Sequence, residues 1–159
     1  MTPEQEVLED LLLATRALIR SVVETQPLMG QPPSSKEAFE AMTSVQRVAS
    51  TALLKEFEQL QGTLHSLFRA MLRMLGIRLK GLYPLDIGNH MVELGVIDEP
   101  ERWVTIVKLR NELVHEYPLG STERFERVVA ALTSIPFLTD AAARAERVIA
   151  DRHMLEPRS

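Results

Sequence analysis

Apolar residues recur at helical spacing along almost the whole chain, and no segment alternates with period two for long enough to predict a strand. The first helix is marked by Thr2 as a hydroxyl cap, Pro3 in the first turn and Gln5 as capping-box partner. The pattern predicts this N-terminal helix over residues 1–25. Residues 26–35 contain three prolines and a glycine, so they are predicted to form a loop.

A continuous helical pattern of about forty residues follows, from Ser34 to Leu75 or Gly76. Ser34 with Glu37 predicts a capping box at its start. Gly62 marks a possible bend, but nothing in the segment forces a break. An apolar stripe of this length must pack along a bundle or across a subunit interface, so its methionines and phenylalanines are predicted core residues.

Two further helices are predicted in the middle of the chain. A short helix over residues 84–94 ends at Gly95, because glycine is the usual residue after a helix C-terminus. Asp98 with Glu101 predicts another capping box, which opens the next helix.

The last helical pattern begins with Ser121 as its cap, is interrupted near Pro136 and resumes from about residue 139 to 155. We find no internal repeat and no linker that would separate two domains. The whole chain therefore predicts an all-α fold in one domain over residues 1–159, an antiparallel bundle of about five to six helices with its core in 36–155.

Composition narrows the class of protein. The 159 residues are 45% apolar and 25% charged, which is typical of a soluble globular domain. A net charge of −4 does not suggest a general polyanion binder, so any contact with nucleic acid needs a local basic patch. The absence of cysteine excludes disulfides and thiol chemistry. The acidic start is unlike a signal peptide and no uninterrupted apolar run approaches roughly 20 residues, so we expect a cytoplasmic location.

One stretch concentrates groups suited to chemistry on a phosphate. Arg110, Asn111, His115 and Tyr117 place a guanidinium, an amide, an imidazole and a phenol within eight residues. Pro118 follows and disfavours helix at the residue before it. We therefore expect His115 and Tyr117 in the last turn of a helix, with Arg110 a turn or more inside it.

The helical wheel places Arg110 in the middle of an apolar face. That face contains Trp103, Ile106, Val107, Leu113 and Val114. A guanidinium is costly to bury without a partner, so Arg110 must face a polar cleft, an internal carboxylate or a second subunit. Arg110 and His115 lie about 140° apart on a straight helix. They share one site if the helix kinks or ends before His115, or if a twofold axis joins two chains.

An arginine and a histidine without metal ligands suffice for one reaction, the cleavage of RNA by its own 2′-hydroxyl. An imidazole titrates near neutral pH, so His115 suits proton transfer. The forked cation of Arg110 suits the extra charge on phosphorus in the transition state. Such a reaction leaves a 2′,3′-cyclic phosphate and a 5′-hydroxyl and spares DNA. The alternative is a purely structural role, with Arg110 in a buried ion pair and His115 as a helix cap.

The motif Arg110-Asn111-x-x-x-His115-x-Tyr117 resembles the signature of HEPN domains, in particular that of the HepT-like ribonuclease toxins. The resemblance extends over about residues 36–150. It includes the segment 52–60 of the long helix and the approach to the motif through Leu94-Gly95-Val96-Ile97 and Trp103.

The resemblance implies an all-α homodimer in which Arg110 and His115 of both chains, supported by Asn111, face a shared cleft. It implies metal-independent endoribonuclease activity (a hydrolase of the nuclease class), with RNA as substrate and tRNA as a candidate among RNAs. It also implies a toxin–antitoxin system whose antitoxin is an MNT-type nucleotidyltransferase that modifies Tyr117 with AMP. No cofactor and no metal are expected.

Four further basic residues are candidates for contact with RNA: Arg69, Arg73, Arg78 and Lys80. A solvated helix face is the commoner role for such residues. The remaining histidines, at positions 65, 90 and 153, have no metal-ligand spacing and are expected to be surface or capping residues. Two other functions stay open, in this order: a non-catalytic subunit that binds RNA, nucleotide or the nucleotidyltransferase, and a plain helical interaction module.

Overall fold

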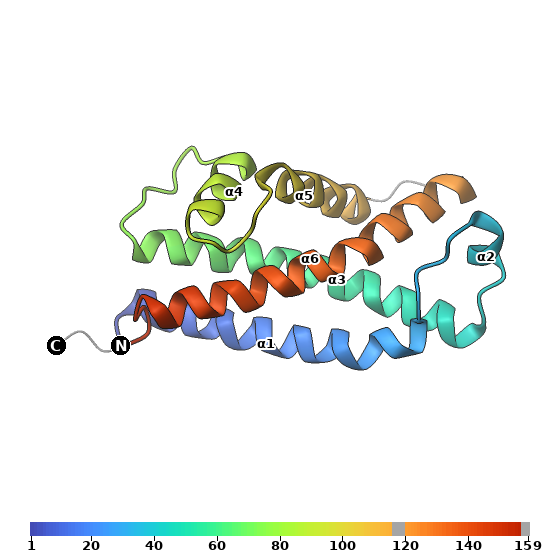
Figure 1. Ribbon diagram of the computed structural model, residues 1–159, viewed down its shortest axis with the longest axis horizontal. Helices are drawn as coiled ribbons and strands as arrows, with labels where there is room; N and C mark the ends of the chain where they lie inside the picture. The colour runs from blue at the N-terminus through green and yellow to red at the C-terminus, as the bar shows by residue number, and fades with distance from the viewer. Residues whose placement is uncertain (116–119, 157–159) are drawn as a thin grey trace.

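The computed structural model describes residues 1–115 and 120–156, which form six α-helices and no strand. The helices are α1 (Pro3–Met29), α2 (Lys36–Glu40), α3 (Ser44–Met74), α4 (Pro84–Glu93), α5 (Pro100–Val114) and α6 (Ser121–Asp151). Figure 1 shows α1 and α3 running antiparallel along the molecule, α6 crossing them, and α4 and α5 above α3. The prediction of an all-α bundle is confirmed.

Helix α3 is the central element, because it packs against α1, α4, α5 and α6. Its large apolar side chains are fully buried, among them Phe57, Leu60, Leu64, Leu67, Phe68, Met71 and Leu72. Each such side chain stabilises the fold by roughly 1.5–3 kcal/mol relative to an exposed position. The predicted apolar stripe of this segment is therefore the core of the bundle.

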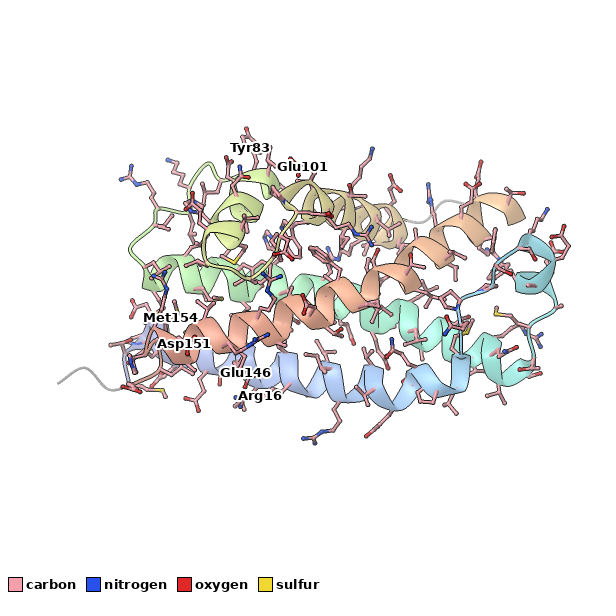
Figure 2. The ribbon with its side chains drawn as sticks, in the orientation of Figure 1. Arg16, Tyr83, Glu101, Glu146, Asp151 and Met154 are labelled. Carbon is pink, nitrogen blue, oxygen red and sulfur yellow. The ribbon has the colours of Figure 1, made fainter. Side chains whose placement is uncertain are left out.

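Polar contacts hold the first and last helices together at the end where the chain begins. Thr2 and Gln5 form the predicted capping box. The buried amide of Gln5 also donates to the carbonyl oxygens of Met154 at 3.2 Å and Glu156 at 2.7 Å. Figure 2 shows Arg16 of α1 facing Glu146 of α6, where the two side chains form an ion pair.

The two proline-rich boundaries differ from prediction, because both helices continue past a proline. Helix α1 runs through Pro27 to Met29, and α6 runs unbroken through Pro136. A proline inside a helix leaves the carbonyl four residues earlier without its donor and needs space for its ring. Both prolines line one cavity of about 620 Å³. Val23 and Leu132, whose carbonyl groups lose their helical donors to these prolines, line the same cavity. The cavity leaves room for the two proline rings and the two carbonyl groups without donors, which a packed interior would not.

The predicted continuous helix from residue 34 to 75 is wrong, since α2 and α3 are separate. Thr43 forms a capping box with Gln46, which starts α3 at Ser44. Arg47 also donates to the carbonyl oxygen of Met42 at 2.8 Å, which satisfies a backbone acceptor in the break. The cap of α2 is Ser35 rather than the predicted Ser34, and its hydroxyl accepts from the N–H of Ala38.

The predicted capping box at Asp98 does not form. Glu99 is the N-cap of α5 and makes no side-chain cap hydrogen bond. The carboxylate of Asp98 instead accepts two hydrogen bonds from Arg144 of α6, at 2.8 and 3.1 Å. Arg144 also donates to the carbonyl oxygen of Gly95, whose φ of +80° ends α4 as predicted. The ion pair with Arg144, which is distant in the sequence, has replaced the local cap hydrogen bond of Asp98.

At the start of α6, Gly120 occupies the N-cap and Ser121 is the first helical residue, so the predicted serine cap lies one position off. The stretch Thr122–Asp151 is, by length and composition, apolar enough to cross a membrane, with a mean hydropathy of 1.2 in its most apolar window. Half of that window is buried inside the bundle, and core helices of soluble proteins meet the same criterion.

The Asp98–Arg144 pair predicts a pH-dependent stability. Arg144 lowers the pKa of Asp98, mainly through its hydrogen bonds and then through its charge. A depressed carboxyl pKa stabilises the fold above the unfolded value of about 4, and this stabilisation is lost as the pH falls through the folded pKa. Asp98→Asn should therefore lower Tm by at most a few degrees at pH 7.

The difference in Tm between wild type and Asp98→Asn should shrink as the pH falls below about 4, the unfolded value, and disappear once the pH is below the lowered folded pKa. Thermal unfolding followed by circular dichroism across this pH range measures it. Glu24→Gln, at an exposed carboxylate on α1, is the matched control and should follow the wild-type curve. An equal loss of Tm at both ends of the range would contradict this role of the pair.

Candidate functional site

Helix α5 carries the predicted motif, and its position is set by the side chains that it buries. Trp103, Ile106 and Leu113 lie in the core, as the helical wheel predicts. The indole of Trp103 is fully buried and packs on Phe68 of α3, with ring centroids 4.9 Å apart. Arg110 continues the same stripe at helical spacing, so it must also face α3.

The guanidinium of Arg110 lies over a glycine of α3. A Cβ placed on Gly62 would be 3.7 Å from Nη2 of Arg110. The Nε of Arg110 is buried and has no hydrogen-bond partner among the residues that the structure describes. Over the same residues, no carboxylate oxygen lies within 4.0 Å of this guanidinium. The internal ion pair that sequence allowed is therefore not seen in residues 1–115 and 120–156.

Two more basic side chains share this part of α3. His65 and Arg69 follow Gly62 at spacings of three and seven residues, which places all three within about 60° on one helix face. Both side chains are partly buried. The pKa of His65 is lowered, first by burial and then by the positive charges of Arg69 and Arg110. We call Gly62, His65, Arg69 and Arg110 the basic recess.

His115 has different surroundings. It is the C-cap of α5, with φ −98° and ψ 44°, and its N–H donates to the carbonyl oxygen of Asn111 at 3.1 Å. Its exposed ring lines a shallow hollow of about 340 Å³. The hollow is formed by Lys108, Asn111, Glu112, His115 and Arg127. Arg127 of α6 and Glu112 form a loose ion pair there, 3.9 Å apart.

Within one chain, the structure therefore brings Asn111 and His115 together and leaves Arg110 on another side of the helix. The reason is that α5 stays regular to Val114 and ends without a kink between Arg110 and His115. The wheel angle of about 140° is kept. The helix ends at Val114, before His115, as one of the two predicted routes to a shared site allows, but this does not bring the two side chains into common surroundings. A site shared across a twofold axis stays a prediction.

The candidate modification site, Tyr117, lies outside the described residues, as does Pro118. Among the four candidate RNA contacts, Arg69 belongs to the basic recess. Arg73 lines a separate hollow with Thr2, Glu4 and Met74. Arg78 and Lys80 are exposed in the connection between α3 and α4, at the far end of α3 from its start (Figure 1).

The other histidines pair with nearby carboxylates. His90 lies 3.9 Å from Glu93, and His153 lies 2.8 Å from Glu156, which raises the pKa of His153. In the parts of the chain that the structure covers, no group of three or more His, Asp or Glu side chains is arranged to hold a metal ion.

Sequence reasoning missed the roles of Gly62 and His65, which it took as a bend and a surface residue. The signal was present in their spacing. A glycine, a histidine and an arginine at i, i+3 and i+7 interrupt a helix that is otherwise rich in large apolar residues. The cavity beside Pro27 and Pro136 is larger than either hollow but contains none of the predicted site residues.

Comparison with known proteins identifies no relative. No family model, no curated protein and no solved structure matches this chain.

Trp103 positions α5, which predicts a graded effect of its replacement. Trp103→Ala should lower the free energy of unfolding by about 3–5 kcal/mol, because it leaves a large cavity against Phe68. Trp103→Phe should cost clearly less, because a ring is kept and the indole N–H has no partner among the described residues. Urea denaturation measures both values. Equal losses for the two variants would contradict the packing role described here.

Proposed function

We propose that this protein is a metal-independent endoribonuclease that acts as a homodimer and forms the toxin half of a toxin–antitoxin pair. One observation carries the proposal: the guanidinium of Arg110 has no carboxylate partner in the described structure, five residues before the exposed imidazole of His115. A cation without a carboxylate partner among the described residues fits a phosphodiester, and an exposed imidazole at a helix end fits proton transfer. The resemblance of this motif to HepT-like toxins supports the same reading.

The reaction uses groups of the substrate and of two protein side chains. The 2′-oxygen attacks phosphorus while His115 accepts its proton, and the bond from phosphorus to the 5′-oxygen breaks. The 5′-oxygen takes up a proton and leaves as a hydroxyl, and the other product is a 2′,3′-cyclic phosphate. Arg110 stabilises the additional negative charge on the phosphoryl oxygens. Asn111 lies beside His115 and supports its position.

A dimer is part of the proposal because Arg110 and His115 of one chain face different surroundings. A twofold axis near the end of α5 would bring His115 of one protomer to Arg110 of its partner. Such an interface is isologous, so two equivalent sites would form.

The cleavage reaction is tested with total tRNA in the presence of EDTA. Wild-type protein should cleave it and leave cyclic phosphate ends, whereas a DNA of the same sequence should remain intact. His115→Ala and Arg110→Ala should each reduce the rate at least about 100-fold, the usual effect of losing an acid–base group or a charge-stabilising donor. Cleavage by either variant at the wild-type rate would refute the assignment of these residues.

The matched control for this experiment is Arg20→Met. Arg20 is exposed on α1, a helix that does not contact α5. The change removes one positive charge, as Arg110→Ala does. Its rate should stay within about twofold of wild type, since isolated surface charges contribute little.

A nucleotidyltransferase of the MNT type is the proposed antitoxin, and Tyr117 is the proposed acceptor of AMP. Co-expression with such an enzyme should add one AMP unit to the wild-type chain, and intact-protein mass spectrometry measures the addition. Tyr117→Phe should receive none, because it lacks the acceptor oxygen, while Tyr83→Phe, at an exposed tyrosine, should be modified like wild type. Modification of Tyr117→Phe would place the acceptor elsewhere.

One observation favours a second function, a non-catalytic subunit that binds RNA or nucleotide. Within one chain, Arg110 and His115 lie in different surroundings. The guanidinium of Arg110 can bind an anion there, but the acid–base group near it is His65 and not His115. Binding of RNA without cleavage at any protein concentration would select this function.

A further inference from the structure

The basic recess collects three cationic or titratable side chains in a chain whose net charge is −4. Arg110 comes from α5, and His65 and Arg69 come from α3. Elsewhere in the described residues Arg16, Arg127 and Arg144 have carboxylate partners, whereas most of the other arginines do not. In residues 1–115 and 120–156, none of the three side chains of the recess has a carboxylate within 4.0 Å.

Gly62 provides the space for this arrangement. Its φ lies outside the left-handed region, so its backbone does not need a glycine. A glycine inside a helix is less favourable than alanine. The neighbouring core positions of α3, such as Leu60 and Leu64, are filled by large buried side chains. A methyl group at this position would be in ordinary contact with the guanidinium of Arg110, at 3.7 Å, whereas a large side chain would occupy the space of that guanidinium.

The partial burial of these groups makes an unmatched charge costly. A buried N–H without a partner destabilises the fold, and the Nε of Arg110 is such a group among the described residues. The positive charges of Arg69 and Arg110 both lower the pKa of His65, so an anion beside them would face two cations. Forked guanidinium groups match the geometry of phosphate oxygens particularly well.

We propose that Gly62, His65, Arg69 and Arg110 form a binding site for a phosphate group of the RNA backbone, with Arg69 and His65 contacting the anion beside Arg110. The identity of the anion as RNA rests on the proposed function, whereas the phosphate site does not require cleavage. His65 contributes an imidazole that donates one hydrogen bond when neutral. This makes Arg69 and His65 determinants of RNA binding in addition to the motif on α5.

The experiment measures binding separately from cleavage by using a 2′-O-methyl RNA oligonucleotide, which has no 2′-hydroxyl to attack. Fluorescence anisotropy of the labelled oligonucleotide gives Kd for the full-length protein. Arg69→Met should weaken binding about tenfold or more, because a charged hydrogen bond is worth roughly 1.5–3 kcal/mol. His65→Gln should weaken binding by a smaller factor, and Arg20→Met is again the charge-matched control. Wild-type Kd values for both Arg69→Met and His65→Gln would overturn the proposal.

Titration of the histidines by NMR measures the pKa of His65 with and without a bound phosphate. If His65 had a purely structural role, adding phosphate would not change this pKa. The charged groups that face His65 are Arg69 of its own helix and Arg110 of α5. A bound phosphate compensates both of them, so saturation with inorganic pyrophosphate should raise the pKa of His65. The pKa of His153 at the end of α6 should not change. An unaltered His65 titration at saturating pyrophosphate would count against the site.

Competition distinguishes the two sources of phosphate. Unlabelled oligonucleotide should displace the probe at far lower concentration than ATP or pyrophosphate, because only the strand makes further contacts. ATP that competes more strongly than the strand would overturn the RNA assignment. Binding that depends on Arg69 without any cleavage would refute the nuclease but uphold the phosphate site. Cleavage by Arg69→Met with an unchanged KM would uphold the nuclease but refute the phosphate site.

Discussion

The structure around the motif depends on one constraint, the register in which α5 packs against α3. Trp103, Ile106 and Leu113 can be buried together only if one face of α5 is turned toward the bundle. Arg110 belongs to that face, so its guanidinium is carried to α3 whether or not a counter-charge awaits it there. Gly62 leaves the room that a larger side chain would occupy. The apolar packing of Trp103 on Phe68 thus places the cation of Arg110 against α3, beside Gly62.

The same packing of α5 against α3 determines which neighbours Arg110 and His115 have. His115 lies beyond the last helical residue and joins Asn111 and Arg127 in an exposed hollow, while Arg110 joins His65 and Arg69. A phosphodiester held by the recess of one chain would therefore need a proton acceptor other than His115 of the same chain, either His115 of a second chain or His65 of the recess itself. The proposed dimer and the proposed phosphate site both start from one observation, a cation at the α3–α5 contact that has no carboxylate partner in residues 1–115 and 120–156.

Several local signals in this chain were overridden by contacts between distant segments. Asp98 has the spacing of a helix cap but binds Arg144, because a bidentate ion pair with α6 competes with a single bond to a backbone N–H. Pro27 and Pro136 have the chemistry of helix breakers but stand inside helices, because both open onto one cavity. Met29, beyond Pro27, is buried and holds the last turn of α1 in place.

The amino-acid sequence by itself determined the helical class, the capping box at Thr2, the end of α4 at Gly95 and the place of Arg110 on an apolar face. These features depend on spacings of three or four residues, which any helix imposes. Only the tertiary structure decided that Arg110 meets Gly62 and His65, that His115 faces another side, and that Asp98 pairs with α6. Those outcomes depend on how one helix face is rotated against another, and that rotation is set by the combined packing of many core side chains. No spacing within a single segment contains that information.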